Sequence, residues 1–273
     1  MTTYQPVNRT VSLPLPSMYD LPSEDPEEPG LPDEFHDWQP QFLSETFQPP
    51  NYPADQILTA TDLNLYYDVH NTSRYKRPDW FAVVGVPRLV DIGRLSYVIW
   101  REGTLPIVVV ELLSPNTQEE DQGQTLRGQD PPSKWEVYEK ILRIPYYVLF
   151  NREANTYRLF RLVGATYQEI FEPRLWIEEL QIGLGLWQGR FQQVERLWLR
   201  WYDANDQWIL TPTEQAEQRA EQERERAEQE RQRAERAEQR AEQERQRAEQ
   251  AQQRAAALAE RLRALGIDPD LPA

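Results

Sequence analysis

The stretch PIVVVEL, residues 106–112, decides the fold class of this chain. Its apolar residues run on without alternating with polar ones, which indicates a strand that is buried on both faces of a sheet. A carboxylate, Glu111, closes the run. Burying a carboxylate is unfavourable unless it is paired, protonated or bound to a cation, so Glu111 is the first candidate for a functional site.

Further strands are predicted around this one from runs rich in β-branched and aromatic residues that Pro, Gly, Asn or Asp bound. These runs are 63–69, 80–86, 96–100, 146–150, 156–163 and 165–171. Between them, residues 133–143 predict a helix, because Ser133 can cap it and apolar residues from Trp135 to Leu142 recur at helical spacing. Strands that flank a helix favour an α/β fold with a mixed sheet, placed in a domain over residues 51–212.

An arm at residues 1–50 precedes the domain. It contains ten prolines, which remove backbone donors, so we expect irregular structure that contacts the domain through Trp38 and Phe42. Ten acidic residues against the single Arg9 give residues 1–60 a net charge of −9. Such a segment repels phosphate backbones. A solvated surface is the preferred interpretation of the acid run, and an inhibitory or partner-binding role is the alternative.

Residues 213–265 predict a long helix, because Glu, Gln, Arg and Ala repeat there without Gly or Pro. Alanine recurs every seven residues from Ala220 to Ala255, and Glu residues interrupt a second row. A weak coiled coil and a lone solvated helix both fit this pattern. Self-association is best supported near Leu258, Leu262 and Leu265, before Gly266 begins a tail at residues 266–273.

Composition excludes several classes of protein. The 273 residues include no Cys and only two His, which rules out disulfides, thiol nucleophiles and thiolate metal sites and leaves oxygen as the main metal ligand. The longest apolar runs are far shorter than the roughly 20 residues of a membrane span. We therefore expect a cytoplasmic protein without membrane contact, whose net charge of −15 would require a local basic patch for nucleic-acid binding.

Two acids mark the ends of predicted strands. Asp79 precedes the strand at 80–86 and Glu111 closes the strand at 106–112. Two carboxylates and a strand carbonyl, such as that of Leu112, form an oxygen shell that suits Mg²⁺ and phosphate substrates. A strand-end Glu is also commonly an exposed turn residue or an ion-pair partner, so this pattern leaves both interpretations open.

Four strings in order resemble one family. They are PDWFAVVGV (78–86), VVVELLSPNTQEED (108–121), KWEVY (134–138) and IPYYVLFN (144–151). This order, over about residues 60–175, resembles the Uma-two family of restriction-endonuclease-like proteins, abundant in cyanobacteria, within the PD-(D/E)xK nuclease superfamily. The resemblance implies a restriction-endonuclease-like fold, with a central mixed β-sheet flanked by helices and, in this chain, a long C-terminal α-helix.

The resemblance also implies a site. Asp79 and Glu111 match the two metal-binding acids, Lys134 and Tyr138 match a K-x-x-x-Y pair, and Ser114 and Asp121 match the turn after the second acid. The implied activity is Mg²⁺-dependent hydrolysis of DNA, with Mn²⁺ as a substitute. Asp79, Glu111 and the carbonyl of Leu112 would hold the metal, and Lys134 would complete the catalytic set.

Three departures from the family and superfamily patterns concern activity. Leu113 occupies the position of the superfamily's Lys, so the amine is expected from Lys134. An insert, QGQTLRGQDPPS, separates Asp121 from Lys134 and is longer than the family's usual spacer. Asn151 replaces an Asp that follows the aromatic strand.

Structural interpretations remain open for several of these residues. Lys76 and Arg77 form the best basic patch for a phosphate backbone, or a surface strand edge. Lys134 is otherwise a solvated first-turn residue, Tyr138 a core residue and Asp121 a cap, while His36 and His70 are expected to be surface or cap residues. The competing function is a catalytically inactive, nuclease-like scaffold that forms a homo-oligomer through the C-terminal helix.

Overall fold

The computed structural model describes residues 33–90, 93–113 and 132–264. The chain divides between Thr211 and Pro212 into two compact units. The first holds the sheets and the short helices, and the second is formed by the helix that begins at Pro212.

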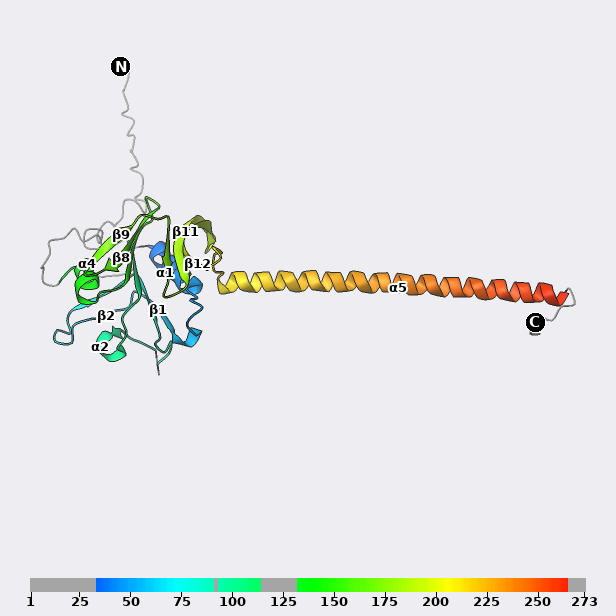
Figure 1. Cartoon of the computed structure of the whole chain (residues 1–273), viewed down its shortest axis with the longest axis horizontal. Coiled ribbons are helices and arrows are strands. Elements are labelled where there is room, and N and C mark those ends of the chain that lie inside the picture. Colours follow the sequence, from blue (N-terminus) through cyan, green and yellow to red (C-terminus); the bar gives the residue numbers. More distant parts are fainter. Residues whose placement is uncertain (1–32, 91–92, 114–131, 265–273) are drawn as a thin grey trace, which may run out of the picture. The chain divides into compact units, whose positions relative to one another are not determined.

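A six-stranded mixed sheet is the centre of the first unit (Figure 1). Its order is β1-β4-β6-β7-β8-β9, in which β6 and β7 are parallel and the other neighbours are antiparallel. The strands are β1 (Ile57–Thr61), β4 (Trp80–Val84), β6 (Val108–Leu112), β7 (Tyr146–Asn151), β8 (Thr156–Val163) and β9 (Thr166–Ile170). All five residues of β6 are buried, as the unbroken apolar run predicts. The chain therefore has the predicted α/β fold, consistent with the restriction-endonuclease class.

One face of this sheet is covered by α1 (Glu34–Thr46) and a second, antiparallel sheet. That sheet contains β10 (Arg174–Ile177), β11 (Ile182–Phe191) and β12 (Val194–Tyr202), none of which the sequence patterns indicated. Val108 and Val110 of β6 point into this layer together with Trp198 and Trp201 of β12.

The expectation of irregular structure is wrong for the segment of α1. Asp33 caps the helix by accepting from the backbone N–H groups of Phe35 and His36, and the helix continues through Pro40. Phe42 is 1% exposed and lies between Trp187, Phe191 and Trp198. The cap and this aromatic burial outweigh the hydrogen bond lost at Pro40. The predicted contact of Trp38 and Phe42 with the domain is present.

The opposite face of the sheet is covered by the predicted helix at 133–143. This segment forms α4 (Lys134–Glu136), capped by Ser133, and continues as one π-helical stretch, η2 (Val137–Ile141). Val137 and Tyr138 pack against Val109 of β6. The sheet therefore lies between two hydrophobic layers, and Glu111 shares the face of Val109 because side chains alternate along a strand.

Small elements complete the unit. The predicted strands at 63–69 and 96–100 are much shorter in the structure, and each contributes two residues to a small three-stranded sheet. The rest of these ranges forms loops or the short helix that is capped by Gly103. The strands of this sheet are β2 (Leu65–Tyr66), β3 (Tyr75–Lys76) and β5 (Tyr97–Val98), and the helical turns nearby are η1 (Ala54–Gln56) and α2 (Ile99–Glu102).

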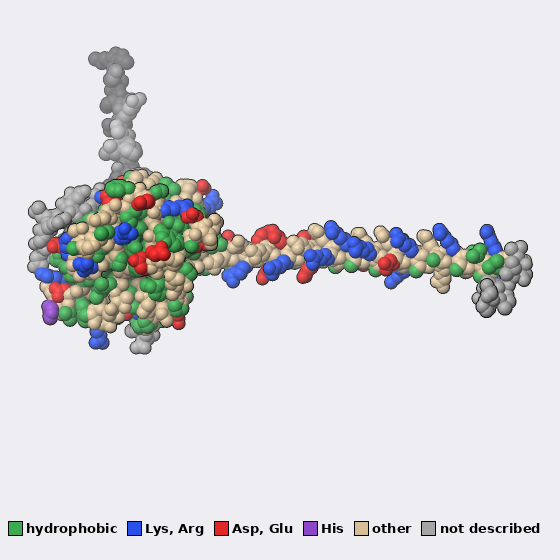
Figure 2. All heavy atoms as spheres, in the orientation of Figure 1, with side chains coloured by type: hydrophobic (Ala, Val, Ile, Leu, Met, Phe, Trp, Pro, Cys, Tyr) green, Lys and Arg blue, Asp and Glu red, His purple; other side chains and the backbone are tan. Residues whose placement is uncertain are grey.

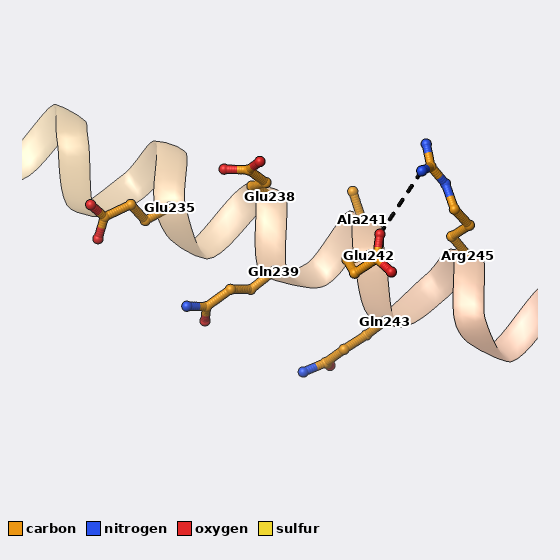
Figure 3. A pocket seen from close by; sticks show the side chains of 7 residues that line it. All are labelled: Glu235, Glu238, Gln239, Ala241, Glu242, Gln243 and Arg245. Carbon is orange, nitrogen blue, oxygen red and sulfur yellow. Dashed lines mark ion pairs between the residues drawn. The ribbon is translucent and has the colours of Figure 1, made fainter.

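The second unit is the predicted long helix, α5 (Pro212–Ala264), which has no buried residue. Arg and Glu side chains are mixed along it in Figure 2. The side chains drawn in Figure 3 all belong to this helix and project in several directions, with Glu242 and Arg245 paired at 3.9 Å. No second described element lines this surface, so it is a solvated helix face rather than a binding site. None of the described helices has the length and apolar character of a membrane span.

Truncation of Phe42 tests the place of α1 in the core. Phe42→Ala should lower the free energy of unfolding by about 3–5 kcal/mol, because it opens a cavity among aromatic side chains. Phe171→Ala is the matched control, since Phe171 is 87% exposed, and should change it by less than about 0.5 kcal/mol. Urea unfolding measures both, and equal effects would contradict the packing of α1.

Candidate functional site

The two strand-end acids, Asp79 and Glu111, lie together at one edge of the central sheet. Because β4 runs antiparallel to β6, Asp79 at the start of β4 adjoins the end of β6. The backbone N–H of Asp79 donates to Glu111 Oε2 at 3.2 Å, and the N–H of Leu112 donates to Asp79 Oδ2 at 2.6 Å. The strand register thus holds both carboxylates in one place.

Glu111 is fully buried and receives two side-chain donors from the helix on its face of the sheet. Lys134 Nζ lies 2.9 Å from Oε2, and the Tyr138 hydroxyl donates to Oε1 at 2.9 Å. The Lys134 side chain is 13% exposed, so the pair is largely removed from water. The ammonium compensates the charge of a carboxylate that would otherwise be very unfavourable at this depth. Lys134 therefore reaches the acids across the insert, and it is not a solvated first-turn residue.

His36 is a neighbour of this site that sequence reasoning missed. It is 3% exposed, and its Nε2 lies 3.2 Å from the carbonyl oxygen of Leu112 while Nδ1 lies 3.1 Å from Asp33 Oδ1. Both partners are acceptors, so this arrangement favours the doubly protonated ring, in which both nitrogens can donate. The expectation of a surface residue is wrong here. The available signal was Asp33 three residues before His36, which places a carboxylate at the cap of a helix beside the ring.

The electrostatics of this group agree with its hydrogen bonds. Burial opposes charging of His36, but the hydrogen bond to Asp33 and the negative charge of Asp79 outweigh it, so its pKa is raised. Burial likewise acts to raise the pKa of Asp33, yet His36 and Arg152 overcome this effect and lower it. The N-terminal turn of α1 thus places the hydrogen-bonded pair of Asp33 and His36 against the carbonyl of Leu112.

Lys76 and Arg77 are the basic residues that precede Asp79 in the chain. Arg77 is exposed and its Nε lies 2.9 Å from Asp62 Oδ1, while Lys76 belongs to the short strand β3. Burial and the charge of Asp79 raise the pKa of Asp62, against the opposing charges of Arg77 and Lys134. Asp62 is therefore a third acid in the electrostatic neighbourhood of Asp79. Ser114 and Asp121 lie outside the described residues.

The donor set at the sheet edge has the chemistry of a hard-cation site. Two carboxylates and one carbonyl offer only oxygen, which suits Mg²⁺ with several waters retained. The described ranges contain no group of three or more His, Cys, Asp or Glu side chains that could hold a metal. A cation here would bind Glu111 while Lys134 still contacts that carboxylate, and would bind the Leu112 carbonyl while His36 still contacts it. Both are possible because carbonyl and carboxylate oxygens each have more than one lone pair.

Comparison with protein families shows the family to which this chain belongs. A family model described as "Putative restriction endonuclease", Uma2, matches residues 13–195. The chain belongs to the Uma2 family. None of the curated proteins with which it was compared matches it. The Uma2 match includes Asp79, Glu111 and Lys134 and the whole of α1, whereas α5 lies beyond it.

Replacement of His36 should change how stability depends on pH. Because the pKa of His36 is raised in the folded state, folded protein binds more protons than unfolded protein above the ordinary value of 6.5. Its stabilising contribution is complete below that pH and is lost as the pH rises through the folded pKa. The free energy of unfolding of wild type should therefore fall with rising pH relative to that of His36→Gln.

Urea unfolding of both proteins over a pH series measures this difference. Exposed His70, replaced by Gln, serves as the control and should follow wild type at every pH. Parallel curves for wild type and His36→Gln would show that the ring is not a buried cation.

Proposed function

We propose that this Uma2 protein is a Mg²⁺-dependent endonuclease that hydrolyses phosphodiester bonds in DNA. The supporting observation is the joint contact of Asp79, Glu111 and Lys134 at one sheet edge, where a carboxylate pair and an amine meet. Family membership supports a nuclease, and this geometry supports the assignment of roles. Divalent-metal use is general among restriction-endonuclease-like proteins, and we propose Mg²⁺, or Mn²⁺ in its place, for this chain.

Each residue has a role in the proposal. Asp79, Glu111 and the Leu112 carbonyl would hold the metal, which when bound lowers the pKa of a water and polarises the phosphate. Lys134 orients the attacking water through its ammonium and offsets the charge that develops on the phosphate oxygens. Tyr138 fixes the orientation of Glu111 by donating to Oε1.

Lys134 substitutes in the proposal for the superfamily Lys. Leu113 stands at the superfamily position, and its side chain is partly buried against the apolar layer that contains Tyr138. A Lys from the helix approaches the same Glu111 from the layer above the sheet. The chemical requirement is an ammonium beside the acids, and either chain position can meet it.

The remaining candidates would bind the DNA backbone or support the site. Lys76 and Arg77 immediately precede Pro78 and Asp79 in the chain, so a DNA backbone bound at the acids would pass near them. Arg77 is already paired with Asp62, which reduces its contribution to phosphate binding. Ser114 and Asp121 are proposed as supporting residues on the family pattern alone.

A metal titration tests the proposed ligands. Mg²⁺ or Mn²⁺ should raise the thermal midpoint of unfolding by mass action, about 2.7 kcal/mol of stabilisation when the metal is at 100 times its Kd. Asp79→Asn should abolish this rise, because the amide keeps the acceptor for the Leu112 N–H but loses the charge. Differential scanning fluorimetry measures the midpoints.

The control for this titration is Asp206→Asn, a change at a surface acid that is paired with Arg174. It should respond to metal as wild type does. If Asp79→Asn/Glu111→Gln also responded like wild type, the ligand assignment would be wrong.

Cleavage of DNA tests the role of Lys134. Purified protein should cut mixed DNA substrates in Mn²⁺, and Lys134→Ala should reduce the rate about 100-fold or more, as for loss of a single group that stabilises transition-state charge. Lys140→Ala is the matched control on the same helical segment, since Lys140 is 41% exposed and pairs with Glu139. Gel assays of both variants measure the rates, and equal cutting by Lys134→Ala would point to a contaminating nuclease.

The second candidate is a catalytically inactive, nuclease-like scaffold that assembles through α5. Its support is a helix that has no buried residue and carries a row of alanines at seven-residue spacing. Against it, arginines recur beside that row at every seventh position from Arg219 to Arg261. Antiparallel pairing through the alanines would place these arginines opposite one another, and parallel pairing would place several opposite Arg224, Arg231 and Arg245. Pairs within the helix, such as Arg231 with Glu235 at 3.2 Å, stabilise it without a partner.

Removal of the helix decides between these two uses of α5. We propose that residues 51–212 belong to a domain that folds without α5, so a chain ending at Thr211 should remain folded by circular dichroism. Light scattering should give both chains the mass of one copy if α5 is a lone helix. A full-length mass of two or more copies that becomes one on deletion would favour the scaffold.

A further inference from the structure

A pair of arginines lies at the same sheet edge as the candidate metal site. The parallel strands β6 and β7 end together, with Leu112 opposite Phe150, and Arg152 follows β7 by one residue. Arg152 forms an ion pair with Asp33, which accepts from His36, which in turn reaches the Leu112 carbonyl. Three successive contacts therefore connect Arg152 to the proposed metal ligand.

The second arginine, Arg196, comes from the start of β12. Its guanidinium carbon lies 4.1 Å from the ring centroid of Phe35, and that of Arg152 lies 5.9 Å from the same ring. Arg196 also donates to the backbone carbonyl of Arg152 at 3.1 Å. One aromatic ring from α1 thus contacts both guanidinium groups.

Positive charge is in excess at this place. Asp33 is the carboxylate that pairs with Arg152, while Arg196 has no carboxylate within 4.0 Å among the described residues. Burial, and then the neighbouring charge of Arg152, lower the pKa of Arg196, with Asp33 acting in the opposite direction. An anion bound between the guanidinium groups would relieve this repulsion.

The donors of Arg196 are suited to an oxyanion. A guanidinium has five N–H donors, and those of Arg196 find acceptors within the described part of the chain only at the carbonyls of Arg152 and Leu197. The cation–π contact with Phe35 holds the guanidinium beside the ring, and its N–H groups can still donate. A planar fork held in this way matches the oxygens of a phosphodiester.

We propose that Arg152 and Arg196 form a binding site for a backbone phosphate of a nucleic-acid strand, next to the phosphate that reacts at Asp79 and Glu111. The inference rests on the proposed function, because it assigns to the substrate strand a second contact at the same sheet edge. The site takes phosphate without regard to base sequence, so it contributes affinity and register rather than sequence recognition.

DNA binding without cleavage tests this site. A fluorescein-labelled duplex is titrated with full-length protein in EDTA, and anisotropy gives the Kd over a series of salt concentrations. Arg196→Gln should raise the Kd about tenfold at low salt and reduce the slope of log Kd against log salt by about one. Arg152→Gln/Arg196→Gln should reduce the slope by about two.

Arg174→Gln is the matched control. Arg174 also stacks on aromatic rings, those of Tyr202 and Trp208, and pairs with Asp206, but it belongs to β10. Its Kd should stay within about twofold of wild type. An unchanged Kd for Arg196→Gln, or an equal loss for Arg174→Gln, would overturn the site.

A second measurement applies if Arg196→Gln does not fold. In wild type labelled with ¹⁵N-arginine, the side-chain N–H signals of Arg152 and Arg196 should shift on DNA addition while that of Arg174 does not, with Arg196→Lys used for assignment. Signals that stay in place would overturn the site. Failure of wild type to bind any DNA would contradict the proposed function itself, whereas DNA binding that ignores Arg196 would contradict this site alone.

Discussion

The contact between Glu111 and Lys134 is the interaction on which the candidate site of this Uma2 protein depends. Glu111 closes a strand whose five residues are all buried, so its charge must be compensated inside the protein. Lys134 supplies the compensation at 2.9 Å and Tyr138 the second hydrogen bond. The helix that begins at Lys134 is therefore fastened to the sheet by the same groups that would perform chemistry there.

The central sheet, the helix that begins at Lys134 and the helix α1 all contribute side chains to this one edge of the sheet. Antiparallel pairing of β4 with β6 places Asp79 beside Glu111, and parallel pairing of β6 with β7 places Arg152 nearby. From the other face, α1 adds His36 against the Leu112 carbonyl. The edge is accordingly a meeting point of acids and bases, in which Glu111 pairs with Lys134 and Asp33 with Arg152. Such mutual compensation allows a buried polar site to persist in an otherwise apolar core.

Much of the central sheet could be predicted from the sequence because its strands carry continuous apolar or aromatic runs. The predicted range 156–163 coincides with β8, and 106–112 contains β6 with Glu111 at its end.

Elements that depend on contacts between distant parts of the chain were harder to predict. The helix α1 was missed because prolines dominate its surroundings, and its stability comes from packing of Phe42 against β11 and β12. His36 was missed because its burial also depends on a distant contact: its partner Leu112 lies 76 residues away in the chain. The three strands after residue 171 were missed although β11 and β12 are long. In β11, Gly183, Gly185 and Gly189 interrupt the run of large apolar residues that marks a strand, and Tyr202 packs over Gly183 where a side chain would not fit.

The most direct measurement of the central claim is the position of a bound metal. Crystals of the full-length protein soaked in Mn²⁺ and measured at the manganese absorption edge should give an anomalous peak between the carboxylates of Asp79 and Glu111, within bonding distance of the Leu112 carbonyl. A peak elsewhere on the protein, with Glu111 still hydrogen-bonded to Lys134 and Tyr138, would contradict it and leave the buried pair as a structural contact.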